Sequence, residues 1–270
     1  MSPKPLLLVE QQSAMRLRGD MKITVVGASG MMGSKVVREL ERDGQDVTQA
    51  STRTGVDAFT GHGLAAAFAD AEVVIDLTDT GSFGNRDALE FFRQAGKNML
   101  RAAKEAGVGH YIALSVVGTD RLVENDYFRA KMVQENLVRA SGLPHTIIRS
   151  TQFLEYFEGI INSTADERGL RLPPAMVQPI AADETATWIS RIAVGAARRA
   201  VIEIAGPEAI ELNELARELL TATQDPRPIS VEADAPYFGV ELAKDTLLPN
   251  EHALEGTVTF HDWLYRAVLA

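Results

Sequence analysis

The chain has 270 residues, of which 46% are hydrophobic and only 6% aromatic, and its net charge is −10. That length suits one large domain or a domain with a smaller lobe, and the composition favours helices packed on a parallel sheet. The acidic balance argues against a nucleic-acid-binding surface, and the absence of cysteine excludes disulfides, thiolate catalysis and cysteine metal sites.

The first 20 residues precede the first predicted strand. We interpret residues 1–20 as an N-terminal extension, either disordered or translated from an upstream start codon; the alternative is that the apolar run at 6–9 packs on the folded domain. This run is too short for the core of a signal peptide, and no run approaches the length of a membrane span. We therefore expect a cytoplasmic protein without membrane contact.

Residues 22–26 form a β-branched run that predicts a buried strand, and apolar residues at helical spacing follow over 34–43. The alternation continues to about residue 150, with further strands predicted at 46–51, 73–77, 111–115 and 145–149 and helices at 63–68, 85–106 and 126–141. Repeated βαβ units of this kind predict a Rossmann-type α/β fold with a doubly wound parallel sheet over residues 21–150.

After residue 150 the alternation is looser. The predicted elements are helices at 151–164, 183–197 and 213–223 and strands at 177–180, 201–205 and 229–231. Asp183 and Asn213 are expected to cap the second and third of these helices. We expect residues 151–270 to form a small C-terminal substrate lobe, some of whose strands return to the main sheet.

Three glycines, Gly27, Gly30 and Gly33, separate the first strand from the first helix. Glycine lets the chain bend out of a strand and lets the backbone approach a diphosphate, and the start of the helix offers unpaired N–H groups to the phosphates. This pattern predicts a dinucleotide site. Its expected contacts are Gly27, Ser29, Gly30, Met31, Met32 and Gly33, with Leu77 and Thr78 at the end of the 73–77 strand. Asp76 interrupts that strand and is expected to accept backbone N–H bonds.

The end of the second strand bears on the choice between NAD and NADP. An NAD site usually has an acidic residue there, which accepts hydrogen bonds from the ribose 2′-hydroxyl. This strand instead ends at Ser51, Thr52 and Arg53, and a forked guanidinium beside hydroxyl groups suits a 2′-phosphate. We therefore expect NADP(H), bound by Ser51 and Arg53. NAD(H) stays open, because Asp57 could reach the ribose if its loop folds back.

A candidate catalytic set consists of Ser115, Tyr127 and Lys131. Tyr127 and Lys131 stand one helical turn apart, and a lysine cation near a phenol lowers the pKa of that phenol. Lys131 could also bind the nicotinamide ribose, and Ser115, also counted among the cofactor contacts, could orient a substrate carbonyl. The alternatives are that the Tyr–Lys spacing is fortuitous and that Lys131 pairs with Glu135.

Several segments together resemble the NmrA-like, NAD(P)H-binding group of atypical short-chain dehydrogenase/reductases. These segments are 27–33, 51–53, 114–118, 127–131 and 141–153, with weaker similarity at 205–207 and 262–264. The resemblance implies a Rossmann core, a small C-terminal lobe and a nicotinamide cofactor in the cleft between them. It also implies Lys131 near the cofactor, Phe153 near the nicotinamide, and Thr151 and Gln152 in the cleft.

The resemblance implies two kinds of function, because some members reduce quinones, azo dyes or other electrophiles and others only sense the NADP(H) state. We expect an NADPH-dependent reductase that transfers hydride to a small apolar electrophile of the quinone or carbonyl type. The alternative is a non-catalytic NADP(H) sensor that contacts a regulator. A third alternative, an epimerase or dehydratase, needs a sugar-nucleotide site rich in Arg and Asn, which the second half does not obviously supply.

The expected substrate pocket is lined by Val117, Gln152, Phe153 and Tyr156, and Tyr237 fits that pocket or the core equally well. The five histidines are scattered without metal-ligand spacing, so no metal is expected. The oligomeric state stays open, with a homodimer as one alternative.

Overall fold

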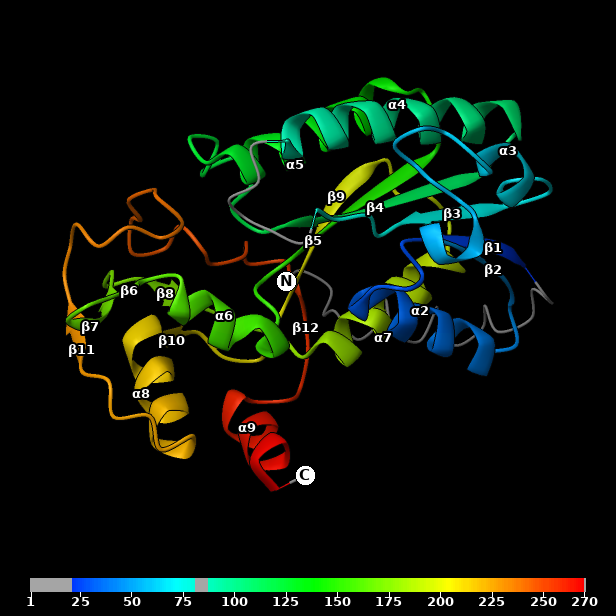
Figure 1. Ribbon diagram of the computed structural model, residues 1–270. Coiled ribbons are helices and arrows are strands. Elements are labelled where there is room, and N and C mark those ends of the chain that lie inside the picture. Colours follow the sequence, from blue (N-terminus) through cyan, green and yellow to red (C-terminus); the bar gives the residue numbers. More distant parts are fainter. Residues whose placement is uncertain (1–20, 81–86, 270) are drawn as a thin grey trace, which may run out of the picture.

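The computed structural model describes residues 21–80 and 87–269, and its centre is a seven-stranded sheet (Figure 1). In their order across the sheet the strands are β12 (Leu254–Glu255), β9 (Ala200–Ala205), β5 (His145–Ser150), β4 (His110–Val116), β3 (Val73–Asp76), β1 (Lys22–Val26) and β2 (Asp46–Ala50). Every neighbouring pair is parallel. The predicted Rossmann-type α/β fold is therefore confirmed.

Helices cover both faces of this sheet, which gives three layers (Figure 1). One face carries α2 (Met31–Arg42) and α7 (Ala182–Ala193), and the other carries α3 (Leu64–Ala67), α4 (Ala88–Glu105) and α5 (Asp126–Ala140). Successive residues of a strand point to opposite faces. Alternating apolar residues therefore fill two cores, with Val25 and Ile75 beneath α2 and Val26 and Val74 beneath α4.

In the second half of the chain, β9 and β12 join the main sheet and α7 covers one of its faces, and the remaining elements form a smaller lobe (Figure 1). The elements of the lobe are η2 (Leu154–Tyr156), α6 (Phe157–Asn162), β6 (Ala165–Asp166), β7 (Gly169–Leu172), β8 (Met176–Val177), β10 (Ile210–Glu211), α8 (Leu212–Ala222), β11 (Ile229–Val231) and α9 (Phe260–Leu269). A third core, which includes Phe157, Tyr237 and Phe260 of the lobe, also contains Phe92 of α4 and Phe128 of α5, and therefore joins the lobe to these two helices.

The strand order places a topological switch point at β1. The chain passes from β1 to β2 on one side, and β3 and all later strands of the sheet lie on the other side. Open parallel sheets bind their ligands outside the carboxyl ends of the strands at such a point. The fold therefore makes the residues after β1, β2 and β3 the first candidates for a site.

The predicted helix at 151–164 is wrong over its first residues. Thr151 stays extended, because its N–H donates to a carbonyl of β9 at 2.9 Å, and Phe153 forms a parallel bridge with Ile180. Helical structure is limited to the 3-10 turn η2 and to α6. Pairing with the later half of the chain thus overrides the helical spacing.

The predicted caps of α7 and α8 are also wrong. Ala181 precedes α7, and the first N–H of that helix donates to the carboxylate of Glu155 at 3.0 Å. Asp183 instead forms an ion pair with Lys35 of α2. Asn213 lies within α8 rather than at its cap. In α7, the capping partner comes from a segment that is distant in sequence.

The extension proposed for residues 1–20 lies outside the described residues. Of the helices in the described ranges, none is long and apolar enough to cross a membrane.

Candidate functional site

The glycine turn lies at the carboxyl end of β1, against the end of β3. Gly27 has a φ of +81°, and a Cβ at this position would lie 2.7 Å from the backbone oxygen of Leu77. At Gly33 a Cβ would lie 2.1 Å from the backbone oxygen of Gly27, so α2 starts in contact with the turn. Side chains are therefore excluded from both positions, as a dinucleotide turn requires.

The N-terminus of α2 is open toward this turn. Gly30 occupies the N-cap position, no capping side chain bonds to it, and the first turn contains no acidic residue. The first N–H groups of the helix therefore lack a side-chain partner and carry the positive end of the helix dipole. This arrangement fits an anionic diphosphate.

The other predicted contacts at the turn lie in different environments. Ser29 is exposed and Met31 is half-buried, whereas Met32 is buried in the core beneath α2. Leu77 is buried, and the hydroxyl of Thr78 donates to a carboxylate at 2.7 Å. Met32 can therefore meet a ligand through its backbone, and Ser29 through its side chain.

A pocket of about 320 Å³ lies beside the turn. Its lining residues are Ala28, Ser29, Ser34, Val37, Arg38, Glu41, Gln49, Ser51, Arg53 and Thr54. The guanidinium of Arg53 donates to the backbone oxygen of Ser29 at 3.1 Å, and that of Arg38 to the backbone oxygen of Ser34 at 3.3 Å. Two cations thus flank the pocket, and both donate to backbone carbonyls rather than to carboxylates.

Two acidic residues near this pocket have local partners. Glu41 accepts a hydrogen bond from the Gln49 amide at 3.3 Å. Asp57, the residue that would favour NAD, is not among the lining residues, and its carboxylate accepts the N–H groups of Phe59 and Thr60. The predicted 2′-phosphate contacts Ser51 and Arg53 therefore share the pocket with a second arginine.

The predicted catalytic side chains each bond to a different partner. Ser115 donates to Glu135 at 2.6 Å, and Tyr127 donates to Asp79 at 3.5 Å. Lys131 donates to the backbone oxygen of Leu114 at 2.7 Å and to Gln134 at 2.6 Å. These contacts hold α5 against the end of β4. Lys131 therefore bonds to Gln134 and not to Glu135, the partner that the sequence analysis gave as an alternative.

The pKa of Tyr127 shifts in the direction opposite to the one expected. Burial raises it, and the nearby Asp79 carboxylate raises it further. Burial also lowers the pKa of Lys131, against the opposing pull of Asp79 and Asp76. Tyr127 therefore donates its hydroxyl hydrogen to Asp79, and its pKa lies above rather than below the ordinary value for a phenol.

Asp76 has a structural role that extends the expected one. Its carboxylate accepts the N–H of Thr78 at 3.0 Å, as predicted, and also the hydroxyls of Thr78 and Tyr111 and the amide of Gln134. Gln134 in turn accepts from Lys131, so a buried polar chain links β3, β4 and α5. This chain fixes the carboxyl ends of the strands that border the site.

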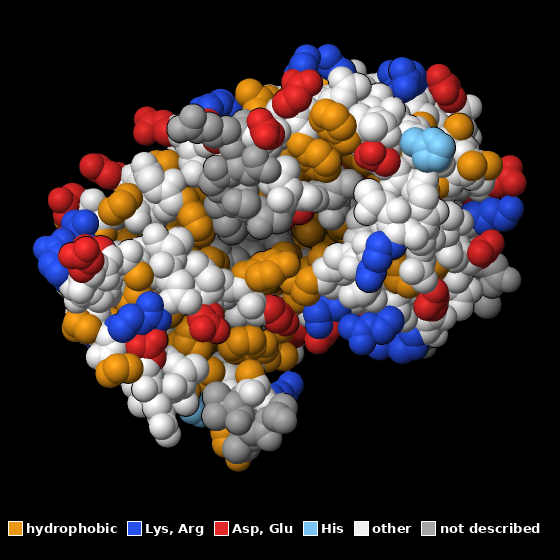
Figure 2. Space-filling model, in the orientation of Figure 1, with side chains coloured by type: hydrophobic (Ala, Val, Ile, Leu, Met, Phe, Trp, Pro, Cys, Tyr) orange, Lys and Arg blue, Asp and Glu red, His pale blue; other side chains and the backbone are white. Residues whose placement is uncertain are grey.

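The predicted substrate residues lie where β5 leads into the lobe. Phe153 and Tyr156 have ring centroids 6.2 Å apart, and Tyr156 is 49% exposed. Gln152 is buried and Val117 is fully buried, so the Val117 side chain is not exposed to a ligand in this structure. Figure 2 shows a hollow in the middle of the face that it presents, with hydrophobic side chains around it.

Arg38 and Asp79 are candidate site residues that the sequence analysis does not single out. Arg38 stands one helical turn after Ser34 on α2, a position that gives no signal until the register of the helix is known. Asp79 follows directly on Thr78, and residues at the carboxyl ends of neighbouring parallel strands meet at one edge of the sheet. That topological rule could have identified Asp79.

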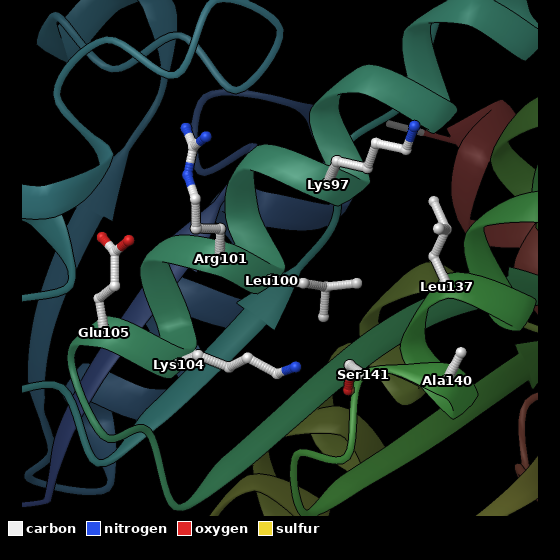
Figure 3. A pocket seen from close by; sticks show the side chains of 8 residues that line it. All are labelled: Lys97, Leu100, Arg101, Lys104, Glu105, Leu137, Ala140 and Ser141. Atoms are coloured by element: carbon white, nitrogen blue, oxygen red, sulfur yellow. The ribbon is translucent and has the colours of Figure 1, made fainter.

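A larger groove, of about 510 Å³, lies between α4 and α5. Figure 3 shows its lining side chains, which are Lys97, Leu100, Arg101, Lys104, Glu105, Leu137, Ala140 and Ser141. The groove is formed by the C-terminal halves of both helices and therefore lies toward the amino ends of the strands. It is remote from the edge where the glycine turn and Asp79 meet.

Comparisons with known proteins agree with this geometry. The model of the NmrA-like family matches residues 19–224. A divinyl chlorophyllide a 8-vinyl-reductase of Oryza sativa subsp. indica is 27% identical over 190 residues, which cover 60% of this chain and 47% of that protein. The photosystem II assembly factor Ycf39 of Cyanophora paradoxa is 24% identical over 159 residues, which cover 54% and 49%. The chain thus spans about half the length of these curated relatives.

Among solved structures, the NAD-dependent NDP-hexosamine 5,6-dehydratase TunA superposes with a TM-score of 0.70 at 12% identity and covers 93% of this chain and 97% of its own. At this identity the likeness shows the fold alone. The family model, in contrast, covers well over half of the chain and includes the glycine turn, Lys131 and Phe153. The chain is therefore a member of the NmrA-like family.

Proposed function

We propose that this protein is an NADPH-dependent reductase that transfers hydride to a small apolar electrophile of the quinone or carbonyl type. The observation that carries the proposal is the open N-terminus of α2 beside a pocket with two arginines. The reductase and the NAD-dependent enzyme among its relatives support a nicotinamide cofactor. The proposed division of labour is a core over residues 21–150 that binds the cofactor and a lobe over residues 151–270 that closes the substrate cleft.

The residues present fit this cofactor. The bare glycine turn admits a diphosphate, and Arg38, Arg53 and Ser51 can surround a 2′-phosphate. The nicotinamide, when bound, supplies the hydride. One proton from solvent completes the reduction of a quinone to a hydroquinone, so that NADPH, a proton and the quinone give NADP⁺ and the hydroquinone.

The proposed roles of the catalytic set follow from its contacts. Tyr127 stays protonated and exchanges its proton with Asp79, which is exposed and can pass a proton on from solvent. Lys131 fixes the end of β4 beside the cofactor through the carbonyl of Leu114. Ser115 also fixes the carboxyl end of β4, because its hydroxyl donates to Glu135 of α5.

A sensor without catalysis is the second candidate, because the hydroxyls of Ser115 and Tyr127 both bond to carboxylates. Purified protein with NADPH and a panel of quinones separates the two functions. A reductase oxidises NADPH in the presence of at least one acceptor. A sensor binds NADPH tightly and oxidises none.

Alanine at Arg53 or at Arg38 is expected to weaken NADPH binding selectively. A charge-assisted hydrogen bond contributes about 1.5–3 kcal/mol, so each variant should lose about 10- to 100-fold in NADPH affinity, with NADH affinity within about 2-fold of wild type. Calorimetric titration of both cofactors measures the difference. Lys97→Ala, in the α4–α5 groove, is the control for loss of a surface cation. Equal losses for NADPH and NADH would refute the 2′-phosphate contact.

Asparagine at Asp79 is expected to slow the reaction by about 100-fold or more, the contribution of a positioned proton-transfer group. The alkaline limb of the pH profile should also move to lower pH, because the Asp79 charge is one cause of the raised pKa of Tyr127. Steady-state rates from pH 6 to above pH 11 test both expectations, because the pKa of Tyr127 lies above the ordinary value of about 10 for a phenol. In Tyr127→Phe the alkaline limb should be absent, because phenylalanine has no hydroxyl to ionise; a limb that persists there belongs to another group.

A further inference from the structure

Gln152 is a buried side chain whose hydrogen bonds are missing. It is 7% exposed, and neither Nε2 nor Oε1 has a partner among the described residues. Its backbone, in contrast, is fixed, because its carbonyl accepts the N–H of Ile180 at 2.9 Å. Buried amides are normally paired, and an unpaired one lowers stability. An unpaired amide beside a candidate cleft indicates that a ligand completes its bonds.

Three tyrosines from different segments lie in the region of this amide. Tyr237, from the lobe, is buried, which raises its pKa; the side-chain amide of Gln152 lies beside the Tyr237 hydroxyl and acts in the opposite direction, although the two groups do not meet the geometry of a hydrogen bond. Tyr156 and Tyr237 both contribute to the raised pKa of Tyr127, so the three phenols lie near one another. Phe153 adds a ring to the same region. Aromatic walls of this kind suit a flat ring, which stacks on them or meets them edge to face.

We propose that Gln152 is the polar anchor of the substrate, and that the substrate is a planar ring compound with an N–H or O–H donor next to a carbonyl. A primary amide offers one donor and one acceptor side by side. A lactam, or a quinone with an amino group beside its carbonyl, offers the complementary pair and forms two hydrogen bonds with it. The identification of this ligand as a substrate rests on the proposed function, whereas its binding does not.

A matched pair of non-reducible ligands tests the anchor by binding alone. Isoquinolin-1(2H)-one presents an N–H beside a carbonyl, and its N-methyl derivative keeps the ring and the carbonyl but lacks the donor. We expect the wild-type protein with NADP⁺ to bind the lactam at least 10-fold more tightly in calorimetric titrations. Equal binding of the two compounds, or binding of neither, would overturn the proposal.

The variant Gln152→Met separates an anchor from a structural residue, because methionine has a similar length and no strong donor or acceptor. We expect its melting temperature to rise, since an unpaired amide is removed. NADPH affinity should stay unchanged, and the 10-fold preference for the lactam should disappear. A variant that keeps the preference would also overturn the proposal.

Gln178 provides the matched control. It is likewise buried, but its amide donates to the backbone oxygen of Gly206 at 2.8 Å. Gln178→Met should therefore lower the melting temperature and keep the lactam preference. If it raises the melting temperature, the stability readout does not report on unpaired amides and the argument from Gln152 fails.

A kinetic pair then connects the anchor to the reaction. In wild type, 2-amino-1,4-naphthoquinone should have a lower KM than 2-methyl-1,4-naphthoquinone, and Gln152→Met should remove this difference. Comparing the ratio between the two proteins cancels the intrinsic reactivity of each quinone. If the lactam preference is observed but no quinone oxidises NADPH, Gln152 binds the ligand as proposed and the proposed reductase function is wrong. If the KM ratio in the variant equals that of wild type, Gln152 does not select the substrate.

Discussion

Alanine at Gly33 is expected to lower the free energy of unfolding by about 4 kcal/mol or more, whereas alanine at Gly30 should leave the fold intact. The Cβ at Gly33 would lie 2.1 Å from the backbone oxygen of Gly27, where no side-chain rotation can relieve the clash. The Cβ at Gly30 would meet only that same oxygen, at 3.3 Å, and the backbone of Gly30 has ordinary extended angles.

The two variants should therefore differ in kind. Urea denaturation should show the loss of stability in Gly33→Ala, and Gly30→Ala should retain wild-type stability within about 1 kcal/mol. Calorimetry should show at least 10-fold weaker NADPH binding in Gly30→Ala, because the added methyl group narrows the approach to the open N–H groups of α2. Full NADPH affinity in Gly30→Ala would place the diphosphate elsewhere.

Alanine at Glu135 is expected to lower the free energy of unfolding by about 3–5 kcal/mol, the usual effect of removing one partner of a buried ion pair. The Glu135 side chain is 1% exposed and accepts two hydrogen bonds from Arg149, both at 2.9 Å. It also accepts from Ser115 and from Arg139 at 2.6 Å each. Without Glu135, the buried Arg149 guanidinium still donates to Asp120, but the Asp120 side chain is more exposed and compensates the charge less well.

The control for this variant is Glu90→Ala, which breaks the exposed ion pair with Arg93 in α4. Exposed pairs contribute less than about 1 kcal/mol, so the denaturation midpoint of this control should move little. Similar losses in Glu90→Ala and Glu135→Ala would show that the Arg149 contact is not what stabilises α5 against β5.

The same carboxylate predicts acid sensitivity. Burial raises the pKa of Glu135, but Arg149 and Ser115 outweigh burial, and the pKa lies below its ordinary value. The resulting stabilisation is complete above the unfolded value of about 4.3 and is lost as the pH falls through the lower folded value. Denaturation between pH 7 and 3 should therefore show a steeper loss of stability in wild type than in Glu135→Ala.

The βαβ half of the fold could be predicted from the sequence because its signals are local. Runs such as Lys22–Val26 are apolar and β-branched, and glycine marks the ends of α2 and α5. The start of the 151–164 prediction and the cap of α7 fail for a shared reason. Contacts with segments distant in sequence fix the conformations of Thr151, Phe153 and Ala181. The spacing of apolar residues does not reveal such contacts.

In the candidate site, too, the local features could be predicted from the sequence and the long-range contacts could not. The glycine turn is local in sequence and was identified by its spacing. The partners of Ser115, Tyr127 and Lys131 depend on which face of α5 meets which strand, so Glu135, Asp79 and Gln134 could not be assigned from spacing alone. The direction of the pKa shift of Tyr127 was mispredicted for that reason: its charged neighbour is an acid, and that acid and burial both raise the pKa.

The place of β9 beside β5 has a consequence for how the molecule comes apart. Residues 200–205 lie far along the chain from their neighbour, yet they supply the hydrogen bonds along one whole border of β5. A fragment that ended near residue 150 would expose that border as a row of unpaired amides and carbonyls, ready to recruit a strand from another molecule. The two halves of the chain therefore share one cooperative unit, and the lobe cannot be removed without inviting aggregation of what remains.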